Sequence, residues 1–345
     1  MQARITGTLQ IAAVYVGTVV GAGFATGKEI VEFFTQYGVY GLFGIIIAGI
    51  IFIRMGTKMM LVSLSIKAKS YKELNTYLFG VRWGTFVNTL FFIMLFGVSA
   101  VMLSGAGAVF EEHLHIEKAW GILITSVLAF AILLQGMKGL FAVNILVVPM
   151  MIVFSFLLLF NGMGQPHFIE DMLSPPKSGL SFKGIISPFL YSAFNLALAQ
   201  AVLVPVAMEV RDEKIIKSGG VVGGIALSAI LMAGHLSLGT LDNVYEYSIP
   251  SAELMRNSIS ALYFLFLIVI YGEIFTSLVG NIFGLERQMK VTIKVNSSIL
   301  FAIILLAAFC IGQFEYGALL SFLYPLFGYV SLVFLFLLYR SKKLE

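Results

Sequence analysis

The chain has 345 residues, of which 59% are hydrophobic and 12% are charged, and its formal net charge is +4. Soluble domains carry about 25% charged residues, so this chain lacks the polar surface that a water-soluble protein needs. The composition therefore predicts an all-α integral membrane protein, and the slight positive charge gives no reason to expect a nucleic-acid partner, because basic residues of membrane proteins gather in cytoplasmic loops.

Ten segments are apolar over about the 20 residues that a helix needs to cross the hydrocarbon of a bilayer. In chain order they are 8–36, 39–66, 84–110, 118–135, 139–160, 184–209, 217–239, 259–284, 296–313 and 317–339. No ten-residue alternation of the kind found in membrane β-barrels is present. The stretch 240–258 is too polar to span, and we expect a loop with a short surface helix there.

The basic residues predict the orientation of these spans. With the N-terminus inside, only five of the 22 Lys and Arg residues fall on the outer side, namely Lys28, Lys118, Lys177, Lys183 and Arg256. Cytoplasmic loops carry the excess of basic residues, so both termini are expected in the cytoplasm. We expect a multi-pass protein of the bacterial plasma membrane.

Ten spans divide into two groups of five, residues 1–160 and 184–345, joined by an outer loop at 161–183. Because five is odd, the second group must be inverted relative to the first. Inverted repeats are a common transporter plan, with the binding site at the midplane between broken helices. The plan predicts that spans one and six are discontinuous. In span six the polar Ser192, Asn195 and Gln200 mark the expected break.

The first span contains the motif GTVVGAGFATGKE at residues 17–29. An unpaired backbone group costs several kcal/mol in hydrocarbon, so an unwound stretch is expected only where it lines a cavity or binds a ligand. The outer half-helix, starting near Thr26, would point its positive end at the gap and favour a carboxylate. The inner half-helix, ending near Gly21, would present free carbonyls to a cation. The alternative is that the glycines only allow close helix packing.

The solute is expected in this gap, with its carboxylate on the amides of Ala25 and Thr26. The candidate solute-binding residues are Gly21, Ala22, Gly23, Phe24, Ala25, Thr26, Ser104, Tyr191, Phe194 and Asn195. In this interpretation the aromatic residues form an apolar wall, and Ser104 and Asn195 hydrogen-bond the other end of the solute. Ordinary packing between helices is the alternative for each of them.

The motif GTVVGAGFATGKEIVEFF, with ten spans in this orientation, resembles the YkvI-type membrane proteins. These are grouped with amino-acid permeases of the LeuT-fold, or amino acid–polyamine–organocation, superfamily. The resemblance covers essentially the whole chain. It implies a five-plus-five inverted repeat, alternating access and a central site between spans one, three, six and eight. It supplies no particular solute.

Sodium-coupled members of that superfamily share a cation site, which implies specific ligands here. Aligning the G-x-G of the break places two carbonyl ligands on Gly17 and Val20, two hydroxyl ligands on Thr276 and Ser277, and a further carbonyl on Glu273. Opposite chain directions put both helical segments in the inner half of the membrane. The alternative is that the two hydroxyls bond to carbonyls of their own helix.

Three charged residues near the gap could take part in ion coupling or gating. The Glu273 carboxylate could strengthen cation binding or carry a proton, since an ionisable group at membrane depth is a functional hypothesis by default. Lys28 could reach Glu273, hold a solute carboxylate, or lie in an outer vestibule beside Glu29. Coupling to sodium and coupling to protons therefore both stay open.

The sequence thus predicts a secondary transporter that imports a small amino acid or related amine-bearing solute, with Na+ as the coupling ion. Its alternatives are a proton-coupled transporter using Glu273 or Lys28, and a ligand sensor with a transporter fold. We expect no enzyme activity, no cofactor and no obligate protein partner besides the lipid bilayer. The run Glu111–His113 is consecutive, so it cannot surround one metal ion with good geometry.

Overall fold

The computed structural model describes residues 2–173, 175, 182–247, 249–290, 293–314 and 316–341, and of these the side chains of 2–3, 22, 171 and 316–326 are outside the description. Within these residues all regular structure is helical. The first predicted span consists of α1 (Gln2–Val19), α2 (Ala22–Ala25), α3 (Lys28–Phe33) and the short 3-10 helix η1 (Thr35–Tyr37). The second consists of α4 (Val39–Ile51), a π-helical turn η2 (Phe52–Gly56) and α5 (Thr57–Ser65).

The remaining elements follow in order. They are α6 (Tyr71–Leu114), α7 (Lys118–Leu133), α8 (Met137–Met163), α9 (Phe168–Leu173), α10 (Phe182–Val210), α11 (Glu213–Leu238), α12 (Pro250–Ser258), η3 (Ser260–Leu262), α13 (Tyr263–Lys290), α14 (Ser297–Gly312) and α15 (Tyr316–Arg340). Each of the ten predicted segments therefore contains a helix. In the part of the chain that the structure describes, six helical stretches are long and apolar enough to cross a membrane, so the protein is a multi-pass membrane protein.

Two segments between the spans differ from the expectation in detail. The helix of the third predicted span, α6, begins at Tyr71, well before the predicted residue 84. It turns at Gly80, where φ is +77°. A positive φ is open to glycine because it has no Cβ. The short helix expected within 240–258 is α12, but Pro250, Leu254 and Met255 are buried, so this helix packs into the molecule instead of lying on its surface.

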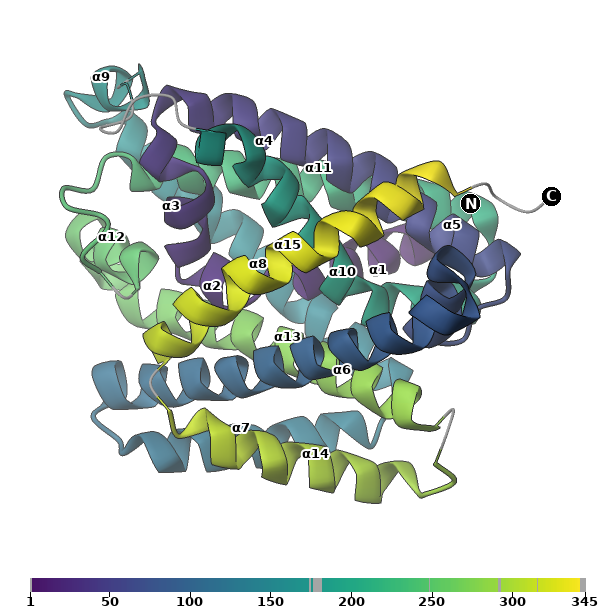
Figure 1. Cartoon of the computed structure of the whole chain (residues 1–345). Helices are drawn as coiled ribbons and strands as arrows, with labels where there is room; N and C mark the ends of the chain where they lie inside the picture. Colours follow the sequence, from purple (N-terminus) through teal and green to yellow (C-terminus); the bar gives the residue numbers. More distant parts are fainter. Residues whose placement is uncertain are drawn as a thin grey trace.

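The broken first span and α10 lie in the middle of the helix assembly (Figure 1). There α1 packs on α11 and α8, and α10 packs on α15, α4, α5 and α13. A lower layer is formed by α6, α7 and α14, and α15 crosses the front (Figure 1). The elements α9 and α12 lie at the left end, opposite the two chain termini (Figure 1). The broken stretch is therefore enclosed by other helices and does not face lipid as a whole.

The predicted break in span six is wrong, because α10 is one uninterrupted helix over Phe182–Val210. Its polar side chains do not open the backbone. Ser192 Oγ donates to Pro188 O at 2.7 Å and Asn195 Nδ2 donates to Tyr191 O at 3.0 Å, one turn earlier in the same helix. Such back-bonding satisfies a polar side chain in an apolar setting without unwinding the helix. Of the two predicted breaks, the described residues show only the one in the first span.

A hydrogen bond fastens α1 to the π-helical turn in span two. Tyr15 is fully buried, and its hydroxyl donates to Phe52 O at 2.8 Å. A π-turn alters the i→i−4 bonding pattern of an α-helix, so an outside donor is well placed here. Gly56 makes the approach possible, since a Cβ at this position would lie 3.0 Å from Tyr15 Cε1 and still closer to the hydroxyl end of the ring.

Candidate functional site

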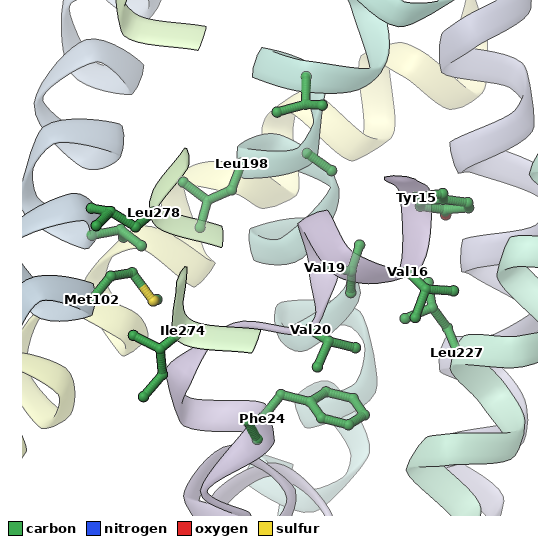
Figure 2. Close-up of a cluster of buried hydrophobic side chains, with 14 of the residues drawn as sticks. Tyr15, Val16, Val19, Val20, Phe24, Met102, Leu198, Leu227, Ile274 and Leu278 are labelled. Carbon is green, nitrogen blue, oxygen red and sulfur yellow. The ribbon is translucent and has the colours of Figure 1, made fainter. Parts of the chain in front are cut away.

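The first span is broken twice within nine residues of sequence. α1 ends at Val19, Val20 and Gly21 are not helical, and the four-residue α2 follows. A second turn occurs at Gly27, whose φ of +83° lies in the left-handed region that favours glycine. Figure 2 shows Val19 and Val20 at the end of α1 and Phe24 just beyond them, among other buried apolar side chains. The predicted discontinuity of span one is therefore confirmed.

The five oxygen ligands inferred for a cation site lie together at the first break. Ser277 Oγ is 2.8 Å from Val20 O and 3.3 Å from Gly17 O. Thr276 Oγ1 is 3.4 Å from Gly17 O and 3.0 Å from Glu273 O. Thr276 thus bonds within its own helix and also faces α1. Because α1 stops at Val19, its last carbonyls have no partner further along the helix, and the two hydroxyls of α13 reach them.

This arrangement is suited to a small, hard cation. Three main-chain carbonyls and two hydroxyls carry no formal charge, and hard oxygen ligands of this kind suit alkali and alkaline-earth ions. The hydroxyls now donate to the same carbonyls with which they would share an ion. A bound cation would replace these hydrogen bonds by ion–oxygen contacts, with little rearrangement of the backbone.

Asn144 on α8 is a further neighbour of this cluster; the sequence marks it as a weaker solute-facing candidate on span five and does not place it beside the cation ligands. Its Oδ1 lies against Gly17, and a Cβ at position 17 would be 2.9 Å from Val148 Cγ2 and 3.0 Å from Asn144 Cγ. Asn144 is buried, and its Nδ2 donates to Leu140 O at 2.8 Å. A side chain at position 17 would meet Asn144 and Val148 of α8, so glycine fits best here. The contact joins spans one and five, and no local pattern in the sequence predicts it.

Two glutamates lie buried beside the breaks. Glu273 is fully buried on α13, and neither of its carboxyl oxygens has a hydrogen-bond partner among the described residues. Glu29 is 2% exposed on α3, and its Oε2 likewise has no partner there. Burying a charge without a partner is costly, so each of these two carboxylates favours a bound proton or a nearby positive charge.

The residues predicted to hold the solute are brought together only in part. Tyr191 is buried, with its ring centroid 5.3 Å from that of Phe33 and 5.0 Å from that of Phe34. Phe194 stacks on Phe327 at 6.5 Å. Ser104 is directed elsewhere, because its Oγ donates to Phe314 O at 2.7 Å.

The backbone at the break is largely engaged. The Ala25 amide, expected to meet a solute carboxylate, donates to Gly21 O at 2.9 Å, and Thr26 Oγ1 bonds Gly23 O at 3.1 Å. The side chain of Ala22 is outside the described residues. The second turn is held by the polar stretch after α11, since Ser251 N donates to Thr26 O at 2.9 Å.

Lys28 does not reach Glu273 in this structure. Its Nζ donates to Tyr245 O at 2.9 Å and to Tyr247 O at 3.1 Å, which ties the start of α3 to the loop before α12. Of the positions suggested by the sequence, this is nearest to a place in the outer vestibule. Lys28 therefore joins the broken span to the loop before α12.

A cavity of about 660 Å³ lies between this loop, α12, the end of α6 and the start of α13. It is lined by Glu112, His113, His115, Glu246, Tyr247, Ile249, Ala252, Glu253, Arg256, Tyr263 and Phe264. Arg256 is paired with Glu253, with Nη2 and Oε2 2.8 Å apart. Three glutamates against one paired arginine give the lining an excess of acidic groups.

The helices are arranged as in solved structures of membrane transporters. The chain is similar in fold to a Na+-coupled sialic acid symporter in a substrate-bound outward-open state, with a TM-score of 0.71 and 13% identity, covering 96% of this chain and 78% of that one. It is also similar to a mutant of the Eremococcus coleocola manganese transporter, with a TM-score of 0.63 and 13% identity, covering 97% and 75%. The fold is therefore one used by secondary transporters.

Sequence comparison identifies the family. The chain is 45% identical over 328 residues to the Bacillus subtilis (strain 168) protein described as "Uncharacterized membrane protein YkvI", covering 94% of this chain and 93% of that one. The chain belongs to the YkvI family of membrane proteins. It is also 23% identical over 328 residues to the B. subtilis protein YyaD, covering 92% of each. No protein-family model matches the chain.

Proposed function

We propose that this protein is a sodium-coupled secondary transporter that imports a small amino acid or related amine-bearing solute by alternating access. The observation that carries the proposal is the convergence of Gly17, Val20, Glu273, Thr276 and Ser277 oxygens at the break in span one. Free carbonyls of an interrupted membrane helix are the usual ligands of a coupling Na+. That one of the fold neighbours is a Na+-coupled symporter supports the same assignment.

The proposal includes ten spans in a five-plus-five inverted repeat, with both termini in the cytoplasm of a bacterial cell. The excess of basic residues in the expected cytoplasmic loops supports this orientation. Since α10 is continuous, the solute site would lie between the broken first span and the helices α6, α10 and α13. The single break then supplies the polar backbone that a pair of breaks supplies in the general plan.

A proton is the second candidate for the coupling ion. The observation in its favour is Glu273, whose buried carboxyl oxygens have no described partner one turn from the hydroxyl pair. An ionisable side chain at membrane depth commonly belongs to a proton or ion pathway. Both ions would act at the same place, so they can be separated by changing one gradient at a time.

The test is uptake into proteoliposomes. Purified protein is reconstituted, a mixture of the twenty amino acids and common amines is added outside, and the contents are analysed by mass spectrometry. An inward Na+ gradient is expected to concentrate a solute, while an inward proton gradient alone is not. Gramicidin, which collapses both gradients, is the control. Accumulation driven only by the proton gradient would mean that the coupling ion is the proton and not sodium. Binding without accumulation under either gradient would mean that the protein is a sensor.

A further inference from the structure

Glu29 occupies an unusual place beside the broken helix. It is the second residue of α3, yet its side chain folds back on α2, where a Cβ added to Gly23 would lie 2.6 Å from Glu29 Cγ and 2.8 Å from Cδ. Gly23 therefore makes room for the carboxyl group. The sequence motif contains this glycine and this glutamate six residues apart, and the turn at Gly27 brings them together.

Among the residues that the structure describes, no basic side chain is paired with Glu29. Besides His235, the buried charged side chains of the described residues are Glu29, Glu273 and Glu286, and all three are acidic. Glu286 faces Lys290 Nζ at 3.5 Å and Arg287 Nε at 3.9 Å. Lys28, the cation next to Glu29 in sequence, points to loop carbonyls. An uncompensated buried carboxylate favours a positively charged ligand and repels an anion.

Tyr191 provides the second unsatisfied group at this place. It is fully buried on α10, its hydroxyl has no partner among the described residues, and its ring lies 5.3 Å from that of Phe33, one turn after Glu29 on α3. Rings of Phe33, Phe34 and Phe52 surround it, the last at 6.0 Å between centroids. A carboxylate, a hydroxyl acceptor and aromatic rings are the groups that bind an ammonium ion.

We propose that Glu29, with Tyr191, recognises the ammonium group of the solute, so that the transported class is amines and amino acids and excludes acids that lack an amine. This assignment rests on the proposed function and reverses the polarity expected from the sequence. The amine, and not the carboxylate, faces α3, because the Ala25 amide is already engaged and the Glu29 carboxylate would repel a second anion. The acidic lining of the outer cavity would attract the same class of solute.

The experiment compares matched probes on the purified full-length protein. The probes are amino acids such as leucine, the amines that lack the carboxylate, such as isoamylamine, and the acids that lack the amine, such as 4-methylpentanoate. Binding is measured by thermal stabilisation in sodium buffer. Amino acids and amines are expected to stabilise the wild type, and the acids are not. In Glu29→Gln the apparent affinity for the amines is expected to fall about 30-fold or more, as for loss of one partner of a buried charge pair.

Two further measurements keep the role of Glu29 distinct from a structural one. The ligand-free melting temperature of Glu29→Gln should stay at or above that of the wild type, because the variant removes an unpaired buried charge. Glu32→Gln, one turn later on the same helix and only partly buried, is the matched control and should keep the wild-type affinity for amines. The proposal is overturned if the acids bind as well as the amines, if no amine or amino acid binds, or if Glu29→Gln retains wild-type affinity. Gradient-driven uptake of an acid that lacks an amine would contradict the role of Glu29 and would still agree with the proposed secondary transport.

Discussion

Replacing Ser277 with alanine should weaken sodium binding by a measurable and specific amount. The Ser277 hydroxyl lies 2.8 Å from Val20 O and 3.3 Å from Gly17 O, so it is one of five inferred ligands and also the partner of two carbonyls in the ion-free protein. Loss of the hydrogen bonds should lower the ion-free stability by about 1 kcal/mol. Loss of the ligand should raise the sodium midpoint about 10-fold, which corresponds to about 1.4 kcal/mol.

The assay is thermal unfolding of the purified protein while NaCl replaces choline chloride at constant ionic strength. Constant ionic strength matters because general screening alone would change the melting temperature. The wild type is expected to show a saturable rise with Na+, and Ser277→Ala a smaller rise at higher concentration. In the double variant with Thr276→Ala the response to sodium should disappear.

Ser237→Ala is the matched control for the loss of a buried hydroxyl. Ser237 is fully buried on α11, and its Oγ donates to Ala233 O at 2.6 Å within its own helix. This variant should lose a similar amount of ion-free stability and keep the wild-type sodium midpoint. The reasoning fails if Ser277→Ala also keeps that midpoint, since the cluster of oxygens would then be only a contact between α1 and α13.

Three further outcomes are expected. Glu273→Gln should abolish any uptake driven by a proton gradient and retain the sodium response, because the inferred ligand is the main-chain carbonyl; persistent proton-driven flux would exclude this carboxyl as the carrier. Gly23→Ala should destabilise the protein by about 1–3 kcal/mol, as overpacking does, because the new Cβ meets the Glu29 side chain; an unchanged melting temperature would show that this carboxyl is free to move. Lys28→Met should increase hydrogen exchange at residues 240–247, since two bonds from its Nζ to that loop are lost; unaltered exchange would mean that the loop is held by other contacts.

Features encoded over short distances in the sequence were the ones that could be predicted. The break in span one follows from a local run of glycines. The resemblance to sodium-coupled transporters supplied Thr276 and Ser277 as its partners, and the direction of each span then gave their depth in the membrane. Oxygens from these two stretches do lie within 3.4 Å of each other.

Features that depend on packing between distant spans could not be predicted. The approach of Asn144 to Gly17 and of Phe33 to Tyr191 joins helices far apart in the chain, and neither pair leaves a periodic signal. The prediction of a break in α10 was wrong for another reason. Ser192 and Asn195 find partners one turn back, and Gln200, whose buried side chain has no partner among the described residues, leaves the helix intact as well, so polar residues alone do not indicate a break.

The bond between Tyr15 and Phe52 couples α1 to the irregular turn in span two. In the proposed transport cycle, an ion that enters between Val20 O and Ser277 Oγ, now 2.8 Å apart, would displace the end of α1. Because the Tyr15 hydroxyl is bonded to Phe52 O and Gly56 lies against the Tyr15 ring, the π-helical turn would move together with α1.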